Sequence, residues 1–242
     1  MNEKETQPLV VGHRGAYNLA PENTLKAFRK AIELEADYIE FDVHESQDGK
    51  LIVIHGVDIL KRMGNDRKIY QMTLKELKKF DLGEGERIPE LKQVFHLAKG
   101  KIGLICELKV KGISEKVTNL LRNENLLDST IIISFDLEEL IKVRKIEPEL
   151  KVGAIVPVNE NYIPDWKIRK TLIQEVIELE FPYIITRFQN IDKEFIDFSH
   201  KHGLKVFTYT PNTKKTIRRV LNLGVDGIFV NNISKAKAVL KE

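Results

Sequence analysis

Residues 9–43 read LVVGHRGAYNLAPENTLKAFRKAIELEADYIEFDV and contain one complete strand–helix–strand unit. The two ends of this segment, Leu9 to Gly12 and Tyr38 to Val43, are short, mainly apolar runs, which are typical of buried strands. Between them, Asn23 to Glu35 has the period of a helix, and Asn23-Thr24 can cap its start. A strand, a helix and a strand in this order indicate a βαβ unit, from which parallel sheets are built.

The same alternation continues to the end of the chain. Six further apolar runs are separated by segments of helical period such as Leu137 to Ile146, and Gly203 and Gly224 can end the helices before the last two runs. Eight units in 242 residues suit a (β/α)8 TIM barrel better than a doubly wound open sheet, and no G-x-G-x-x-G follows Val11. The six runs are Gly103 to Leu108, Thr130 to Ser134, Lys151 to Val156, Tyr183 to Thr186, Lys205 to Thr210 and Gly227 to Val230.

One region interrupts this alternation after the second run. Lys50 to Ile54 reads as an extra strand, and residues 56–90 contain turns and a short Lys-rich helix. We therefore expect a single TIM-barrel domain, residues 1–242, with a small insertion at about residues 56–90. Because loops at the carboxyl ends of barrel strands build the active site, the insertion is expected to form a wall of the site or a lid.

The composition limits the partners and the location. The chain is 42% hydrophobic and 31% charged, and its net charge of +3 is spread without the dense basic clusters that nucleic-acid binders use. The single cysteine, Cys106, cannot form an internal disulfide, and residues 1–7 lack the apolar core of a signal peptide. No apolar run approaches the ~20 residues that span a bilayer. We expect a cytoplasmic protein with no stable membrane anchor and no nucleic-acid partner; the oligomeric state stays open.

Three carboxylates stand where barrel enzymes carry their reactive groups, at the carboxyl ends of strands. Glu40 and Asp42 are two residues apart in the second run, so both side chains point into the barrel. Glu107 adds a third carboxylate, with Lys109 on the same face of the third run. Three carboxylates suit one hard divalent cation, Mg²⁺ or Ca²⁺, or else Mn²⁺. The alternative for Glu40 and Asp42 is a pair neutralised by Lys or Arg.

Two histidines stand at the same expected rim. GHRG at residues 12–15 ends the first run and contains His13 and Arg14, and His55 ends the extra strand. Two imidazoles with ordinary pKa values near ~6.5 can act as general base and general acid. The alternatives are surface hydrogen bonding for His13-Arg14 and strand-end capping for His55. Arg14 and Lys109 would add the positive charge that binds phosphate. The other histidines are expected on the surface or on helices without a catalytic role: His44, His96, His200 and His202.

In combination these motifs resemble the glycerophosphodiester phosphodiesterase family over nearly the whole chain. GHRG at residues 12–15 is followed by PENT at residues 21–24, and the later motifs follow in the family's order. They are Glu40-x-Asp42, His55, residues 85–89 (GERIP), Glu107-x-Lys109, Ser134-Phe135 and residues 226–228 (DGI).

The resemblance implies a barrel that hydrolyses glycerophosphodiesters, such as glycerophosphocholine or glycerophosphoethanolamine, to an alcohol and sn-glycerol 3-phosphate. In the implied mechanism one histidine takes the proton of the neighbouring glycerol hydroxyl, which attacks phosphorus, while the other protonates the leaving oxygen. Water then opens the cyclic phosphate with the roles reversed. Which histidine is the first base stays open. The implied roles are metal binding by Glu40, Asp42 and Glu107, acid and base catalysis by His13 and His55, and phosphate binding by Arg14 and Lys109.

The chain departs from the family pattern at two places. Where the family has His-Asp, this sequence has His55-Gly56, and Asp58 could take the place of the missing carboxylate. The family's Trp-Thr-x-Asn is here YTPN at residues 209–212, so the aromatic wall changes its size.

Aromatic residues near strand ends are candidates for contacts with glycerol or the leaving group. They are Phe135, Phe188 and Tyr209, and ordinary core packing is the alternative for each.

Three other functions compete with this interpretation. A lysophospholipase D would act on a lipid with one acyl chain, and an open apolar groove beside the metal would favour it. A barrel that binds a phosphorylated metabolite without turnover would have lost catalysis, with Gly56 as part of that loss. A nucleic-acid phosphodiesterase would need a basic and aromatic track that the mild charge does not supply.

Overall fold

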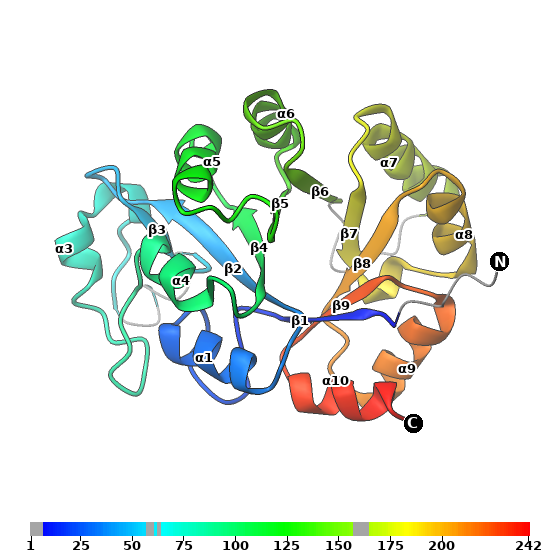
Figure 1. Ribbon diagram of the computed structural model, residues 1–242, viewed down its shortest axis with the longest axis horizontal. Coiled ribbons are helices and arrows are strands. Elements are labelled where there is room, and N and C mark those ends of the chain that lie inside the picture. The colour runs from blue at the N-terminus through cyan, green and yellow to red at the C-terminus, as the bar shows by residue number, and fades with distance from the viewer. Residues whose placement is uncertain (1–6, 57–60, 62–63, 157–164) are drawn as a thin grey trace.

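The computed structural model describes residues 7–56, 61, 64–156 and 165–242. These residues form one sheet of nine strands, whose eight parallel strands close into a barrel because β1 pairs with both β2 and β9. Figure 1 shows the helices around the outside of the strands. The predicted (β/α)8 TIM barrel is confirmed. The strands are β1 Leu9–Gly12, β2 Tyr38–Glu45, β3 Leu51–Val53, β4 Gly103–Leu108, β5 Thr130–Ser134, β6 Lys151–Ile155, β7 Tyr183–Arg187, β8 Lys205–Tyr209 and β9 Gly227–Val230.

Helices connect each barrel strand to the next and cover the outside of the barrel (Figure 1). None of those that the structure describes is long and apolar enough to cross a membrane. The helices are α1 Leu25–Glu33, α3 Leu74–Leu77, α4 Leu91–Ala98, α5 Ser114–Asn123, α6 Leu137–Ile146, α7 Trp166–Glu178, α8 Lys193–Lys201, α9 Lys214–Leu223 and α10 Ile233–Leu240, with short 3₁₀ turns η1 Ile69–Gln71 and η2 Phe188–Asn190.

The strands alternate between two apolar cores. Val11 and Ile105 belong to the cluster inside the barrel, whereas Val10 and Cys106, each one residue away, belong to the larger cluster that includes the buried faces of the helices. This alternation follows from the period of two along a strand. Because Glu107 is two residues beyond Ile105, its side chain belongs to the inner face and continues the barrel interior toward the carboxyl ends of the strands.

The residues predicted to start and end helices do so, with one correction. Thr24 caps α1, because its hydroxyl accepts the backbone N–H of Ala27. Asn23 does not act as a cap: its backbone is left-handed, with φ +57°, and its side chain turns into the barrel. At the other ends, Gly224 takes the left-handed conformation that ends α9, and Gly203 takes it just after α8.

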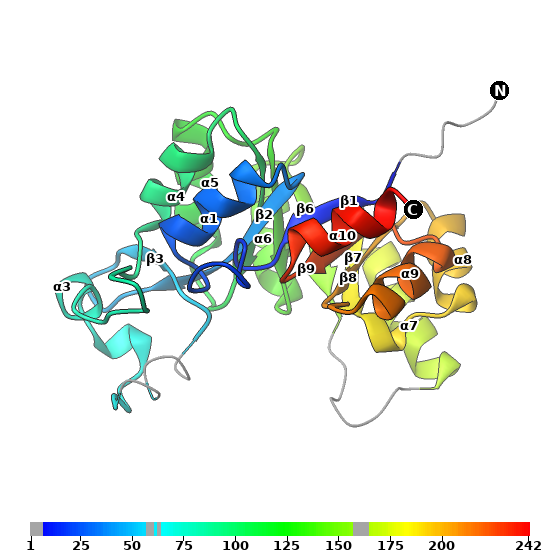
Figure 2. The same ribbon diagram turned by 90° about the horizontal axis from the view of Figure 1, so that it is seen from below.

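The region after β2 forms a lobe of its own. β2 continues to Glu45, beyond the predicted end at Val43, because its last residues pair antiparallel with β3. Figure 1 and Figure 2 place α3 at the edge of the molecule, beyond β3. The lobe has a small apolar cluster made of Ile52, Ile54, Ile69, Met72, Leu77 and Ile88.

Candidate active site

A cavity of about 410 Å³ opens where the barrel strands end. One part of its wall is charged or polar and comes from residues on or after β1, β2, β3 and β4. The other part is mainly apolar and comes from β5 to β9. The charged and polar part consists of His13, Arg14, Glu40, His55, Glu107 and Lys109. All the residues predicted from the sequence for catalysis and phosphate binding therefore meet in one cavity.

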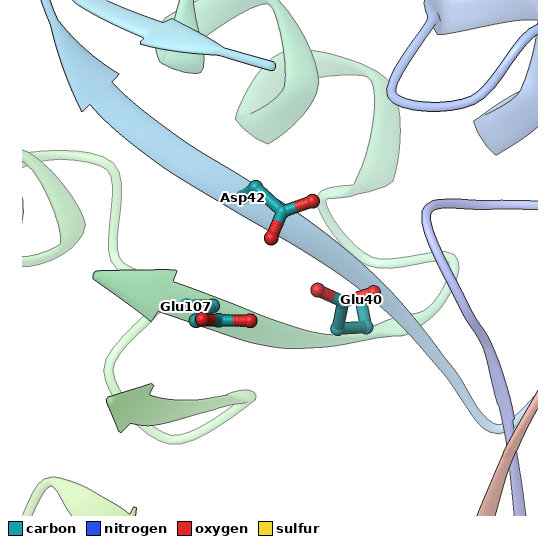
Figure 3. Close-up of side chains that lie close together, drawn as sticks. All are labelled: Glu40, Asp42 and Glu107. Carbon is teal, nitrogen blue, oxygen red and sulfur yellow. The ribbon is translucent and has the colours of Figure 1, made fainter. Parts of the chain in front are cut away.

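The three predicted metal ligands lie together, and two of them, Glu40 and Glu107, line this cavity. Figure 3 shows Glu40 and Asp42 on β2 facing Glu107 on the neighbouring strand β4. One carboxylate oxygen from each lies within 4.8 Å of the others. The strand register explains the proximity, because Asp42 is paired directly with Glu107. Their exposed fractions are only 2%, 1% and 8%, so all three carboxylates are buried.

Two cations contact this carboxylate cluster. Lys109 Nζ lies 2.7 Å from Glu107 Oε1 and 3.5 Å from Asp42 Oδ1. Arg14 Nε lies 3.5 Å from Asp42 Oδ2, while an outer guanidinium nitrogen of Arg14 donates to Glu22 at 2.9 Å. The alternative interpretation, neutralisation by Lys or Arg, is therefore partly correct. Arg14 and Lys109 face four carboxylates, however, so these two side chains balance only two of the four negative charges when all the carboxylates are ionised.

The pKa values reflect this excess of negative charge. Burial, together with Asp42 and Glu107, raises the pKa of Glu40 well above its usual value. Burial and the charge of Asp42 raise the pKa of Glu107 to about 7. At Asp42 burial acts in the same direction, but Lys109 and Arg14 overcome it and lower the pKa to about 2. The carboxylate oxygens lie close together and lack enough positive charge around them. This combination fits a hard divalent cation.

The loop between β1 and α1 holds the β2 carboxylates in place. Asn23 Nδ2 donates to Asp42 Oδ2 at 2.7 Å, and Asn23 Oδ1 accepts the backbone N–H of Asp42 at 3.2 Å. The backbone N–H of Arg14 donates to Glu40 Oε2 at 2.8 Å, and the N–H of Asn23 donates to the Arg14 carbonyl. Sequence reasoning missed this role of Asn23, although the PENT motif that contains it was the available signal.

The two histidines sit differently in the cavity. His13 Nδ1 is 2.9 Å from Asn231 Oδ1, and its Nε2 is 4.0 Å from Glu40 Oε2. His55 is half-buried just after β3. Burial and the neighbouring Arg14 lower the pKa of His13 to about 4. Burial lowers the pKa of His55 to about 4 against the opposing charge of Asp42. Both imidazoles are therefore neutral at neutral pH in the metal-free chain.

The remaining histidines do not line the cavity. His96 is on α4, His200 is on α8, and His202 is the residue that ends α8, as the sequence predicted. His44 corrects its prediction, because it is neither on the surface nor on a helix. It is half-buried on β2, and its Nε2 is 3.3 Å from the His55 carbonyl.

The apolar part of the wall contains all three predicted aromatics, which are Phe135, Phe188 and Tyr209, with Ile133, Ile155, Ile185 and Phe229 beside them. Phe135 is 48% exposed, and Lys109 Nζ lies 5.8 Å from the centre of its ring. Sequence reasoning missed Arg187, which ends β7, lines the same cavity and hydrogen-bonds Tyr209. The signal for it was a cation at the end of the apolar run YIIT, residues 183–186.

The described part of the insertion does not reach the cavity. Of residues 56, 61 and 64–90, which the structure describes, none lines the cavity. Asp58, the suggested substitute for the family's Asp, lies outside the described residues. At Gly56 an added Cβ would meet nothing within 4 Å, so the backbone there leaves room for a side chain.

Known proteins share both the sequence and the fold. Residues 13–235 match the model of the glycerophosphoryl diester phosphodiesterase family. A glycerophosphodiester phosphodiesterase of Caldanaerobacter subterraneus is 35% identical over 237 residues, which cover 93% of this chain and 94% of that protein. A glycerophosphodiester phosphodiesterase of Thermotoga maritima superposes with a TM-score of 0.80 at 28% identity, covering 98% of this chain and 99% of that one. An Oleispira antarctica phosphodiesterase in complex with the product sn-glycerol-3-phosphate superposes with a TM-score of 0.84 at 26% identity, covering 98% of each chain.

Proposed function

This chain belongs to the glycerophosphoryl diester phosphodiesterase family and is a glycerophosphodiester phosphodiesterase, and we propose that it acts on small diesters such as glycerophosphocholine or glycerophosphoethanolamine. The proposed products are an alcohol and sn-glycerol 3-phosphate, the product bound in the similar Oleispira antarctica structure. One observation supports this most strongly: Glu40 and Glu107, with Asp42 beside them, share one cavity of about 410 Å³ with His13, His55, Arg14 and Lys109.

We propose that Glu40, Asp42 and Glu107 hold one divalent cation, Mg²⁺ or Ca²⁺, or else Mn²⁺. The support is the spacing of their oxygens, within 4.8 Å of one another, their burial, and the raised pKa values of Glu40 and Glu107, which show that the buried carboxylates lack compensating positive charge. Such a cation would offset charge on the phosphate group and make a nearby hydroxyl more acidic.

Arg14 and Lys109 are proposed to hold the phosphate. Both line the cavity, and each is anchored by a carboxylate that limits its movement. Burial opposes the charge of both side chains, but the carboxylates raise the pKa of each above its usual value, so both stay cationic. A fixed guanidinium and a fixed ammonium bind a phosphodiester without much further loss of side-chain freedom.

His13 and His55 are proposed to move the protons. One accepts the proton of the glycerol hydroxyl next to the phosphate, and that oxygen attacks phosphorus. The other, whose pKa rises beside the bound anion, donates a proton to the leaving oxygen. Water then opens the cyclic phosphate while the two histidines exchange roles, and sn-glycerol 3-phosphate is released.

The apolar part of the wall favours a second candidate, lysophospholipase D activity. Phe135, Phe188, Tyr209 and the isoleucines of β5, β6 and β7 offer apolar surface opposite the charged residues. This surface suits the carbon atoms of glycerol or of a small alcohol, and it could also bind the first part of an acyl chain. A barrel that only binds its ligand has less support, because both histidines and all three carboxylates are in place.

A substrate panel tests the proposal. Glycerophosphocholine, glycerophosphoethanolamine and lysophosphatidylcholine are each incubated with the chain and Mg²⁺, Ca²⁺ or Mn²⁺, and the products are identified. We expect sn-glycerol 3-phosphate from the two small diesters. Choline release from the lysolipid alone would instead assign lysophospholipase D activity, and no turnover with any pair would contradict an enzymatic role.

A further inference from the structure

The two ring nitrogens of His13 face different groups. Nδ1 is 2.9 Å from Oδ1 of Asn231, the residue that follows β9. Nε2 is on the side of the carboxylate cluster, 4.0 Å from Glu40 Oε2. One nitrogen is therefore used to hold the ring, and the other is available to the substrate.

Asn231 is itself fixed by its backbone. Its N–H donates to Asn212 Oδ1 at 3.1 Å, and its carbonyl accepts the N–H of Asn18 at 3.3 Å. The N–H of His13 donates to the carbonyl of Val230, so the chain before Asn231 is tied directly to the start of the β1–α1 loop. These contacts join the ends of β1, β8 and β9, and they fix the main chain of Asn231 beside the His13 ring.

An amide oxygen only accepts hydrogen bonds, and a neutral imidazole carries only one N–H. The proton of the ring therefore lies on the nitrogen that meets Asn231, and the other nitrogen keeps its lone pair. We propose that Asn231 is a positioning residue that holds the proton of His13 on Nδ1 and presents the Nε2 lone pair to the substrate. This inference rests on the proposed function.

His55 is held in a different way. Within the part of the chain that the structure describes, its ring makes no side-chain hydrogen bond, and the residue after it is Gly56 rather than an aspartate. Among the described residues, none holds the His55 ring through a side-chain hydrogen bond as Asn231 holds the His13 ring. In the proposed function His55 takes the complementary role, as acid when His13 is the base and as base when His13 is the acid.

The tautomer of His13 can be measured without any assay of activity. Nitrogen-15 NMR of the Mg²⁺-loaded wild-type chain at neutral pH shows which ring nitrogen carries the proton, and comparison with His13→Ala assigns the signal among the six histidines. We expect a protonated Nδ1 and an unprotonated Nε2. A proton on Nε2, in either the neutral or the charged ring, would overturn the proposal.

Two substitutions test whether Asn231 causes this preference. Asn231→Leu removes the acceptor at similar size, and Asn231→Asp keeps an oxygen in place. We expect Asn231→Leu to lower kcat by about 10-fold or more with KM changed less than about 3-fold, and to lose the Nδ1–H signature. Asn231→Asp should keep the signature and restore most of kcat.

Asn222→Leu provides the matched control, since Asn222 is an exposed residue of α9 outside the cavity. It should keep both wild-type kcat and the His13 signature. If Asn231→Leu folds but keeps the Nδ1–H signature and kcat, Asn231 does not position the ring. If the wild-type chain cleaves no glycerophosphodiester, the proposed function fails, whereas the wild-type spectrum still decides the tautomer.

Discussion

Replacing His55 is expected to lower turnover without destabilising the fold. The residue is half-buried at the cavity and its ring supports no other part of the described structure, so His55→Ala should leave the fold intact. We expect turnover to fall by about 10²-fold or more, because a general acid or base is lost. The measurement is kcat for a small diester with circular dichroism as a check on folding. His96→Ala on α4 is the matched control, and near-wild-type kcat in His55→Ala would remove His55 from the mechanism.

The raised pKa of Glu107 predicts a pH-dependent metal site. At pH values below about 7 the metal-free chain holds a proton on Glu107, and metal binding must release it. Metal affinity should therefore increase with pH, by about 10-fold from about pH 6 to about pH 8 for Glu107 alone. Calorimetric titration in two buffers with different protonation enthalpies measures the released protons directly. Constant affinity and no proton release would contradict this account of the cluster.

At the residue scale, sequence reasoning was most successful where a local rule applied. Glu40 and Asp42 could be placed together because side chains alternate along a strand, and the structure confirms that Glu107 joins them. Asn23 and Asn231 could not be found in the same way. Their partners lie 19 and 218 residues away in the chain, so packing of the β1–α1 loop on β2 and closure of the barrel between β1 and β9 bring them into contact.

At the element scale, the β1–α1 loop depends on Gly15. Gly15 has φ +85°, and a Cβ there would lie 2.7 Å from the backbone carbon of Ala27 in α1. Gly15→Ala should therefore lower the free energy of unfolding by about 1–3 kcal/mol. It should also raise KM, because the loop carries Arg14. Urea unfolding measures the first effect and initial rates measure the second.

Gly56→Ala serves as the comparison for that variant. A Cβ at Gly56 meets no atom within 4 Å and its φ is not positive, so we expect a change within about 0.5 kcal/mol. Equal stabilities of Gly15→Ala and Gly56→Ala would show that the tight approach to Ala27 does not constrain the loop.

The elements themselves were largely predictable, and their ends were not. All eight parallel strands occur where apolar runs predicted them, because hydrophobic periodicity is a local property. β2 exceeds its predicted end because β3 pairs with it, and α1 begins at Leu25 because Thr24 rather than Asn23 is the cap. Both differences arise from contacts between segments that are apart in the sequence, which the pattern of one segment does not reveal.

At the scale of the whole molecule, we predict that the chain unfolds as one domain. The large apolar cluster includes residues from β1 and α10, at opposite ends of the chain, and β2 belongs to both the barrel and the lobe after it. Fluorescence of Trp166, the single tryptophan, and far-ultraviolet circular dichroism should therefore report the same urea midpoint. Two separate transitions would show that the lobe with α3 unfolds independently of the barrel.

The most direct test of the central claim is the metal dependence of diester hydrolysis. Release of sn-glycerol 3-phosphate from glycerophosphoethanolamine is measured after EDTA treatment and again after Mg²⁺, Ca²⁺ or Mn²⁺ is added back, in the wild-type chain and in Glu40→Gln. We predict that EDTA abolishes release, that at least one of the three cations restores it in the wild type, and that Glu40→Gln needs about 10-fold or more of that cation. Full activity of the wild type in EDTA, or equal cation requirements in the two chains, would contradict the account.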